Sequence, residues 1–187
     1  IINILCMTGW WGIYASKDKK DMLWPDMIWL YILAYDVWNF QYTYLNLPTH
    51  TWYCGLALLL APTFANHFWN KGGWIMNRAN TLAIWCMFAQ IFPLFQETTA
   101  DGTTYYPWAT VSRQYADGTV NGIVAGTSNN ADPTAMTIVS ALALIVNAIA
   151  LGYIIYKSVK NKKNPYTNEV FTDFKYYKDA LARADVK

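Results

Sequence analysis

Long apolar stretches with almost no charge inside them constrain this sequence more than any other feature. Four of them cover residues 23–44, 51–69, 81–95 and 135–156. A helix needs roughly 20 mainly apolar residues to cross a membrane, because each residue adds about 1.5 Å across an apolar core about 30 Å thick. Charged residues make up only 14% of the chain, well below the share in ordinary soluble domains. The stretches therefore predict an all-α fold, a polytopic transmembrane helix bundle.

A fifth apolar stretch, residues 1–15, opens the sequence and is too short to cross a membrane. It begins without a Met and lacks the basic start of a signal peptide. We therefore expect it to be the second part of a spanning helix, in a chain that is the C-terminal portion of a longer protein. The bundle is expected to occupy residues 1–157, and a tail to follow at 158–187.

Lysine and arginine predict the orientation of this bundle. If each apolar stretch crosses once, all but one of the 14 basic residues fall on the side of the C-terminal tail, and only Arg113 lies on the other side. Loops rich in Lys and Arg stay in the cytoplasm. The tail is therefore expected in the cytoplasm, and the long loop at residues 96–134 outside.

The outer loop and the tail each carry a local pattern. In the loop, Ala-Asp-Gly turns at 100–102 and 116–118 border segments rich in β-forming residues, which indicates a β-hairpin. The loop is either a lid over an outward-facing cavity or a surface hairpin without such a role. In the tail, residues 168–183 predict an amphipathic helix that either lies on the membrane or docks on the bundle. The basic run at 160–165 is attractive to anionic lipid headgroups.

Asp36 is the acidic residue that lies well inside a predicted span, and ionisable groups there suggest a function because their burial is costly. Tyr35, Trp38 and Tyr42 surround it in the sequence, and Asn39 lies about one turn further along. A carboxylate among aromatic rings suits an organic cation through ion pairing and cation–π contact. Two alternatives remain open, a proton relay and a polar contact that holds helices together.

Polar residues of other spans complete the candidate site. Gln90 is expected near the level of Asp36, and Asn147 near the midplane, where a lone polar residue usually bonds across a helix interface. Asp26 is expected to cap the start of the first full span or to join a polar inner mouth. The candidate ligand-binding residues are Tyr35, Asp36, Trp38, Asn39, Tyr42, Gln90 and Asn147.

The sequence predicts no catalytic residue and no metal ligand. The three cysteines match no metal spacing and no disulfide framework. Haem or a quinone could bind between helices without a local motif, so the cofactor stays unknown.

Several segments together resemble one known family. They are residues 9–20, 24–27, 34–40, 55–60, 78–83, 139–144, 162–165 and 169–173. In these segments the chain resembles an uncharacterised family of bacterial multi-pass integral membrane proteins, known only as a domain of unknown function. The resemblance implies a bacterial source, hence the inner membrane, and further helices before residue 1. It implies no activity, cofactor or catalytic residue.

The function expected from these features is the binding or movement of a small molecule, cationic or aromatic, in an aromatic-lined pocket around Asp36. One alternative is a membrane-embedded enzyme acting on a lipid or quinone. Another is a structural subunit of a membrane complex. The expected partners are membrane lipids and a small-molecule ligand, with a homo-oligomer or a membrane complex as the assembly and no nucleic acid.

Overall fold

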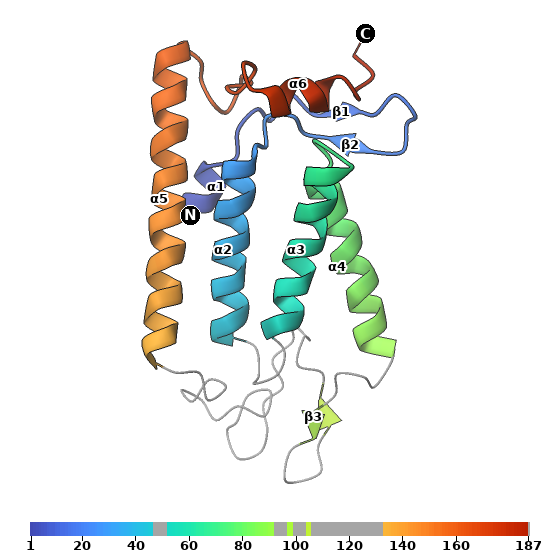
Figure 1. Cartoon of the computed structure of the whole chain (residues 1–187), viewed down its shortest axis with the longest axis vertical. Helices are drawn as coiled ribbons and strands as arrows, with labels where there is room; N and C mark the ends of the chain where they lie inside the picture. Colours follow the sequence, from blue (N-terminus) through green and yellow to red (C-terminus); the bar gives the residue numbers. More distant parts are fainter. Residues whose placement is uncertain (47–51, 92–96, 99–103, 106–132, 187) are drawn as a thin grey trace.

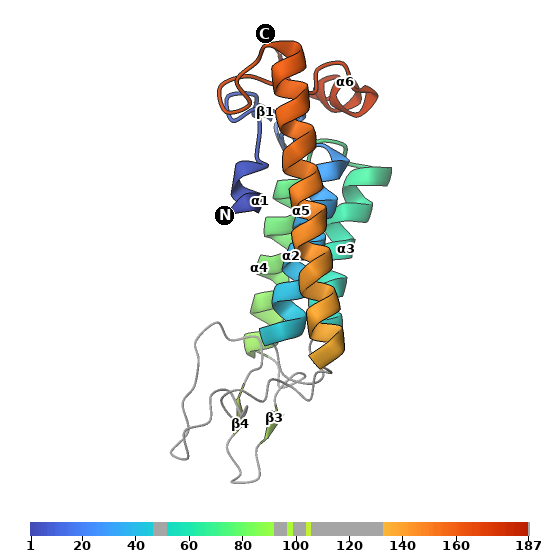
Figure 2. The same cartoon turned by 90° about the vertical axis from the view of Figure 1, so that its left-hand side faces the viewer.

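Four long helices dominate the protein. The computed structural model describes residues 1–46, 52–91, 97–98, 104–105 and 133–186 (Figure 1). The long helices run side by side in both views (Figures 1 and 2). They are α2 (Trp29–Asn46), α3 (Trp52–Phe68), α4 (Trp74–Ile91) and α5 (Pro133–Asn161). α2 packs against α5 and α3, and α3 packs against α4. The expectation of a mainly helical protein is confirmed.

α5 is the longest helix, with 29 residues, which corresponds to about 43 Å. It begins at Pro133, where the missing N–H of proline costs no helical hydrogen bond. Among the described residues, α5 is the one helix that is long and apolar enough to cross a membrane, judged by length and composition. The other three long helices have 17 or 18 residues each, or about 26 Å.

A layer of short elements covers one end of the bundle, which we call the tail end. It contains α6 (Lys175–Leu181) and the antiparallel pair β1 (Tyr14–Ala15) and β2 (Met22–Leu23), with α1 (Ile2–Leu5) beside α2 and α5 (Figure 1). In this pair Tyr14 lies opposite Leu23 and Ala15 opposite Met22. Ser16 forms a further antiparallel bridge with Ala184, so the beginning and the end of the chain meet.

Ion pairs and hydrogen bonds dock the tail on the rest of the molecule. Lys157 on α5 pairs with Asp173 at 2.7 Å, and Lys71 pairs with Asp179 on α6 at 2.9 Å. Further along, the Arg183 guanidinium pairs with Asp21 at 2.7 Å. Of the two expected arrangements for the tail, the structure shows docking.

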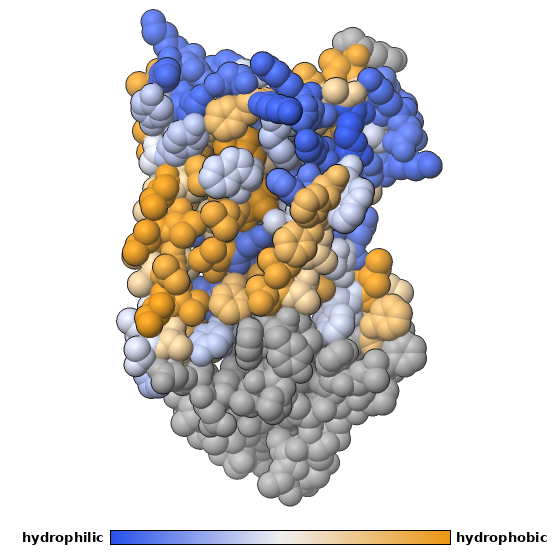
Figure 3. All heavy atoms as spheres, viewed as in Figure 1, coloured by the Kyte–Doolittle hydropathy of each residue, from blue (hydrophilic) through white to orange (hydrophobic). Residues whose placement is uncertain are grey.

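The best-buried part of the molecule lies near the tail end, whereas the sides of the bundle are apolar and exposed. The largest fully buried side chains include Leu23, Ile28, Leu59, Trp74, Val170 and Phe171. Large apolar side chains at least 45% exposed occur on every long helix, among them Leu33, Phe64, Ile84 and Ile145. In Figure 3 the hydrophobic surface covers the side of the bundle, and the hydrophilic surface gathers at the tail end.

Several predicted boundaries differ from the structure. Residues 1–15, expected to end a spanning helix, are helical only at Ile2–Leu5. The chain turns away after this helix, where Gly9 adopts a φ of +63° and its N–H donates to the carbonyl of Pro165 in the tail at 2.9 Å. The span expected at 23–44 begins only at Trp29, because the residues before it bind the tail.

The remaining differences concern later segments. α4 begins at Trp74, seven residues before the expected start at 81. The tail helix is shorter than the expected 168–183, since the Val170 and Phe171 amides donate to a side chain instead of continuing a helix. In the outer loop, β3 (Glu97–Thr98) pairs with β4 (Thr104–Tyr105), and the residues between them lie outside the described ones. The predicted hairpin segments beyond residue 105 lie outside the described residues.

Candidate functional site

A cavity of about 490 Å³ lies between α2, α3 and α5, and one residue of the tail, Tyr176, also lines it. α3 supplies one face at helical spacing, because its lining residues follow one another every three or four positions. They are Leu56, Leu59, Leu60, Thr63, Asn66 and His67. The polar members of this face lie toward the tail end of α3, and the leucines lie further from it. The cavity is therefore polar toward the tail end and apolar beyond.

Asp36 contributes the carboxylate of this cavity from α2. Its Oδ2 accepts a hydrogen bond of 2.6 Å from the Thr63 hydroxyl, which in turn accepts one of 3.0 Å from the Trp74 indole N–H. Three helices are joined by this short chain of hydrogen bonds. The second oxygen, Oδ1, is buried and has no partner among the described residues. The carboxylate can therefore accept a further hydrogen bond or charge.

Arg78 on α4 is the cation that acts on Asp36 electrostatically. Its side chain is 8% exposed, and no ion pair joins it to Asp36 within the described part of the chain. The guanidinium does not line the cavity. Asp36 thus lines the cavity, while the buried positive charge that acts on it lies outside the lining.

The aromatic residues expected around Asp36 point elsewhere. Tyr35 packs edge-on against Trp74 and Trp38, with ring centroids 4.9 and 5.5 Å apart, and its hydroxyl accepts a hydrogen bond of 3.3 Å from Asn39. None of Tyr35, Trp38, Asn39 and Tyr42 lines the cavity that contains Asp36. Because successive helical residues turn by about 100°, positions 36 and 38 face nearly opposite directions. The expected aromatic pocket is therefore not formed by these residues.

Asn147 is a buried connection between helices. Its side-chain amide donates to the carbonyl oxygens of Ala34 at 3.0 Å and Ala143 at 2.8 Å, and its oxygen accepts from the Asn3 amide at 3.0 Å. Asn147 and Trp38 line a second cavity of about 600 Å³, away from Asp36. The side chain of Gln90 lies outside the described residues. Of the candidate residues whose side chains the structure describes, Asp36 alone lines its cavity.

From its position before the helix, Asp26 was expected to cap α2, but it does not. It is 1% exposed and accepts three hydrogen bonds: from the Thr8 hydroxyl at 2.6 Å, the Val170 amide at 3.0 Å and the Phe171 amide at 2.8 Å. Burial raises the pKa of this carboxyl, and the three hydrogen bonds oppose the shift. Asp26 thus holds the tail through Val170 and Phe171. None of its hydrogen bonds among the described residues reaches α3 or α4, so these contacts give no support to the polar mouth that was considered for it.

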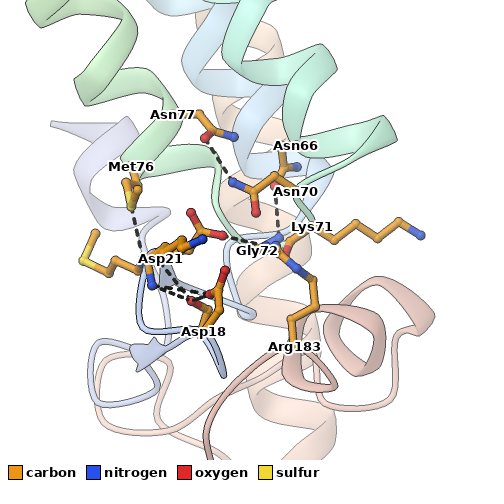
Figure 4. A network of polar contacts seen from close by, with 12 residues as sticks. Asp18, Asp21, Asn66, Asn70, Lys71, Gly72, Met76, Asn77 and Arg183 are labelled. Carbon is orange, nitrogen blue, oxygen red and sulfur yellow. Dashed lines mark hydrogen bonds and ion pairs between the residues drawn. The ribbon is translucent and has the colours of Figure 1, made fainter.

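Polar contacts at the tail end converge on the short connection between α3 and α4 (Figure 4). The Gly72 amide donates to Asn66 Oδ1 at 3.0 Å and to the Tyr176 hydroxyl at 3.1 Å. Tyr176 also donates to Asn66 at 2.9 Å. The tail helix is thus bonded to the same α3 residue that lines the cavity.

Sequence reasoning missed the role of Thr63, Trp74 and Tyr176 beside Asp36. A signal for α3 existed, since Thr63, Asn66 and His67 follow one another at helical spacing on an otherwise apolar helix. Among the described residues, no group of three or more His, Cys, Asp or Glu side chains could hold a metal ion.

Comparison with known proteins places the chain in a family. The profile described as "Family of unknown function (DUF5692)" matches residues 1–183, nearly the whole chain. The chain belongs to this family. The resemblance to an uncharacterised family is thereby confirmed in its general form. No curated protein and no solved structure matches the chain.

Proposed function

We propose that the protein is a multi-pass protein of the bacterial inner membrane, with its tail in the cytoplasm. The exposed apolar side chains on all four long helices support this, because an aqueous solvent would leave them unfavourably hydrated. The lengths of α2, α3 and α4, about 26 Å each, suit a bilayer core about 30 Å thick. The lysines of the tail and of the β1–β2 turn gather at one end, as the positive-inside rule requires.

The function we propose is the binding of a small, mainly apolar molecule that carries a cationic or hydrogen-bond-donating group. The observation that carries this proposal is the presence of Asp36 in the lining of an otherwise largely apolar cavity of about 490 Å³. That volume and that kind of lining are usual for small-molecule sites. Asp36 would receive the polar group, and the leucine face of α3 would cover the apolar body.

The polarity of the cavity indicates how such a molecule would lie. Asn66, His67 and Tyr176 line its tail-end part, and Leu56 and Phe40 line the part further away. An amphiphile with its polar group toward the cytoplasmic face and its apolar part in the membrane core matches this gradient. Transport of the molecule, the further possibility raised by the sequence, would require its release on the other side.

Native mass spectrometry of the protein released from lipid nanodiscs tests the binding proposal. We expect a small-molecule adduct on the wild-type protein that is lost in Leu60→Trp, which fills the cavity, and is weakened in Asp36→Asn. Leu82→Trp is the matched control, because Leu82 is exposed on α4 and lies outside the cavity lining. A structure in lipid with no density in the cavity, or an adduct equally retained by Leu60→Trp, contradicts the proposal.

Labelling of single introduced cysteines tests the topology separately. With the native cysteines replaced, Lys178→Cys on α6 should react with a membrane-impermeant reagent only after the cells are opened. Labelling of Lys178→Cys in intact spheroplasts contradicts the proposed orientation without bearing on the cavity.

A further inference from the structure

Buried polar atoms without partners gather between Asp36 and the tail end of the bundle. Five of the buried side-chain atoms that have no partner among the described residues lie on four side chains here: Asp36 Oδ1, Asn70 Oδ1, Asn77 Nδ2, and Nε and Nη1 of Arg78. Leaving a buried polar atom unpaired costs more free energy than a typical hydrogen bond contributes net to stability. Buried polar groups in native proteins are therefore paired with protein atoms or with internal water.

These side chains lie along one route. Trp74 on α4 is bonded through Thr63 to Asp36, and Arg78 follows Trp74 by one helical turn. Asn77 precedes Arg78, and its Oδ1 accepts a hydrogen bond of 3.1 Å from the Asn70 amide (Figure 4). Asn70 lies in the connection after α3, at the tail end. The route therefore leads from Asp36 along α4 to the tail end.

The unpaired atoms complement one another through water. Asp36 Oδ1 and Asn70 Oδ1 accept hydrogen bonds, whereas Arg78 and Asn77 offer N–H donors. One water molecule can accept from the guanidinium and donate to the carboxylate, and another can accept from Asn77 and donate to Asn70. Such waters need two or more polar partners, and each position on this route provides them.

We propose that a file of internal water molecules joins Asp36 to the tail end between α3 and α4, and that Asp36 exchanges its proton along this file. A proton passes from the water next to Asp36 Oδ1 to that oxygen and returns by the same route, so no other reactant is needed. The charged or titratable groups around Asp36 are Arg78, which acts on it from α4, and His67 from α3 and Tyr176 from the tail, which line the same cavity. α5 contributes only Val139 and Leu142 to the shared cavity.

This inference does not depend on the proposed ligand. The water file lies on the α4 side of Asp36, since neither Arg78 nor Asn77 lines the 490 Å³ cavity. A protein without any bound small molecule would still exchange the Asp36 proton. Conversely, a dry α3–α4 interface would leave ligand binding in the cavity unaffected.

Solid-state NMR of the full chain in lipid, labelled with ¹³C at aspartate carboxyls, tests the proposal. The measured quantity is the rate at which magnetisation passes from water to the Asp36 carboxyl carbon, assigned by its loss in Asp36→Asn. We expect a rate within about threefold of that of the exposed Asp18 carboxyl, and a chemical shift that changes with buffer pH. A rate more than tenfold slower than that of Asp18, or a shift that does not change between pH 4 and 9, overturns the proposal.

Three variants identify the route. Asn77→Leu should slow the transfer to Asp36 at least threefold, because it removes a polar side chain and inserts an apolar one. Asn80→Leu, at an exposed position of the same helix, should leave the rate unchanged, and so should Leu60→Trp in the cavity. Slowing by Leu60→Trp, or none by Asn77→Leu, overturns the route. Should Asn77→Leu not fold, Asn70→Leu replaces it, since Asn70 is the other half of the same hydrogen-bonded pair.

Discussion

Gly72 occupies a position where a single added methyl group should destabilise the contact between the tail helix α6 and the bundle. Its φ of +84° lies in the region that favours glycine, and a Cβ at this position would come within 2.8 Å of the Cβ of Ala180 on α6. Ala180 is fully buried and cannot turn aside. A positive φ costs an alanine about 1–2 kcal/mol, and overpacking typically adds about 1–3 kcal/mol. We therefore expect Gly72→Ala to lower the free energy of unfolding by about 3 kcal/mol.

The matched control is the same substitution at Gly152 on α5, where a new Cβ would meet nothing within 4 Å. Alanine is the better helix former, so Gly152→Ala should stabilise the protein by roughly 0.5–1 kcal/mol. Thermal unfolding in nanodiscs measures both, and about 3 kcal/mol corresponds to a decrease in Tm of roughly 6–12 °C in a chain of this size. A Tm for Gly72→Ala within 2 °C of the wild type would refute the close contact with α6.

Three further predictions concern polar contacts. Asp26→Asn should lower the hydrogen-exchange protection of the Val170 and Phe171 amides at least tenfold, because hydrogen bonds to a charged acceptor contribute about 1.5–3 kcal/mol each. The control is Asp185→Asn, in the exposed pair with Lys19, which should leave the protection of these amides unchanged. Asn147→Leu should destabilise the protein by about 1–2 kcal/mol in thermal unfolding, whereas Ala148→Leu at the neighbouring exposed position should not. Lys157 lowers the pKa of Asp173, and Lys71 lowers that of Asp179. Both pairs therefore stabilise tail docking above the ordinary carboxyl pKa, and lose that effect as the pH falls through the lowered values. Spin labels on Lys17→Cys and Lys178→Cys should move apart as the pH is lowered from 6 through these lowered carboxyl pKa values, and an Asp173→Asn/Asp179→Asn variant should remove this pH dependence.

The long helices could be predicted because their signal is local. Apolar runs such as the one inside α5 are readable from neighbouring residues alone, without knowledge of what packs against them. The start of α2 could not be read in this way. Residues 23–28 are apolar enough to extend the helix, but contacts from Thr8, Val170 and Phe171 hold Asp26 outside it. These partners are far away in the sequence, and no local pattern indicates them.

The candidate site likewise contains a residue that the local sequence indicates and a partner that it does not. Asp36 was identifiable because a carboxylate in an apolar stretch is conspicuous, and it does line the cavity. Its partner Thr63 depends on how α2 and α3 face each other, which the sequence alone does not determine. The placement of Trp38 was within reach, however. At 100° per residue, position 38 cannot share a helix face with position 36.

The contacts that close the tail-end layer join residues up to 170 positions apart in the chain, as between the Asp185 amide and the Ala15 carbonyl. A ribosome adds about 5–20 residues per second, so the first partner waits roughly 10–30 s for the second. Throughout that time the Asp26 carboxyl and the apolar side chains near Leu23 are uncovered, because the residues that bury them have not been synthesised. A chain that ends before residue 165 would leave this surface open permanently. Closure of the layer therefore distinguishes a chain that reaches residue 185 from one interrupted before residue 165.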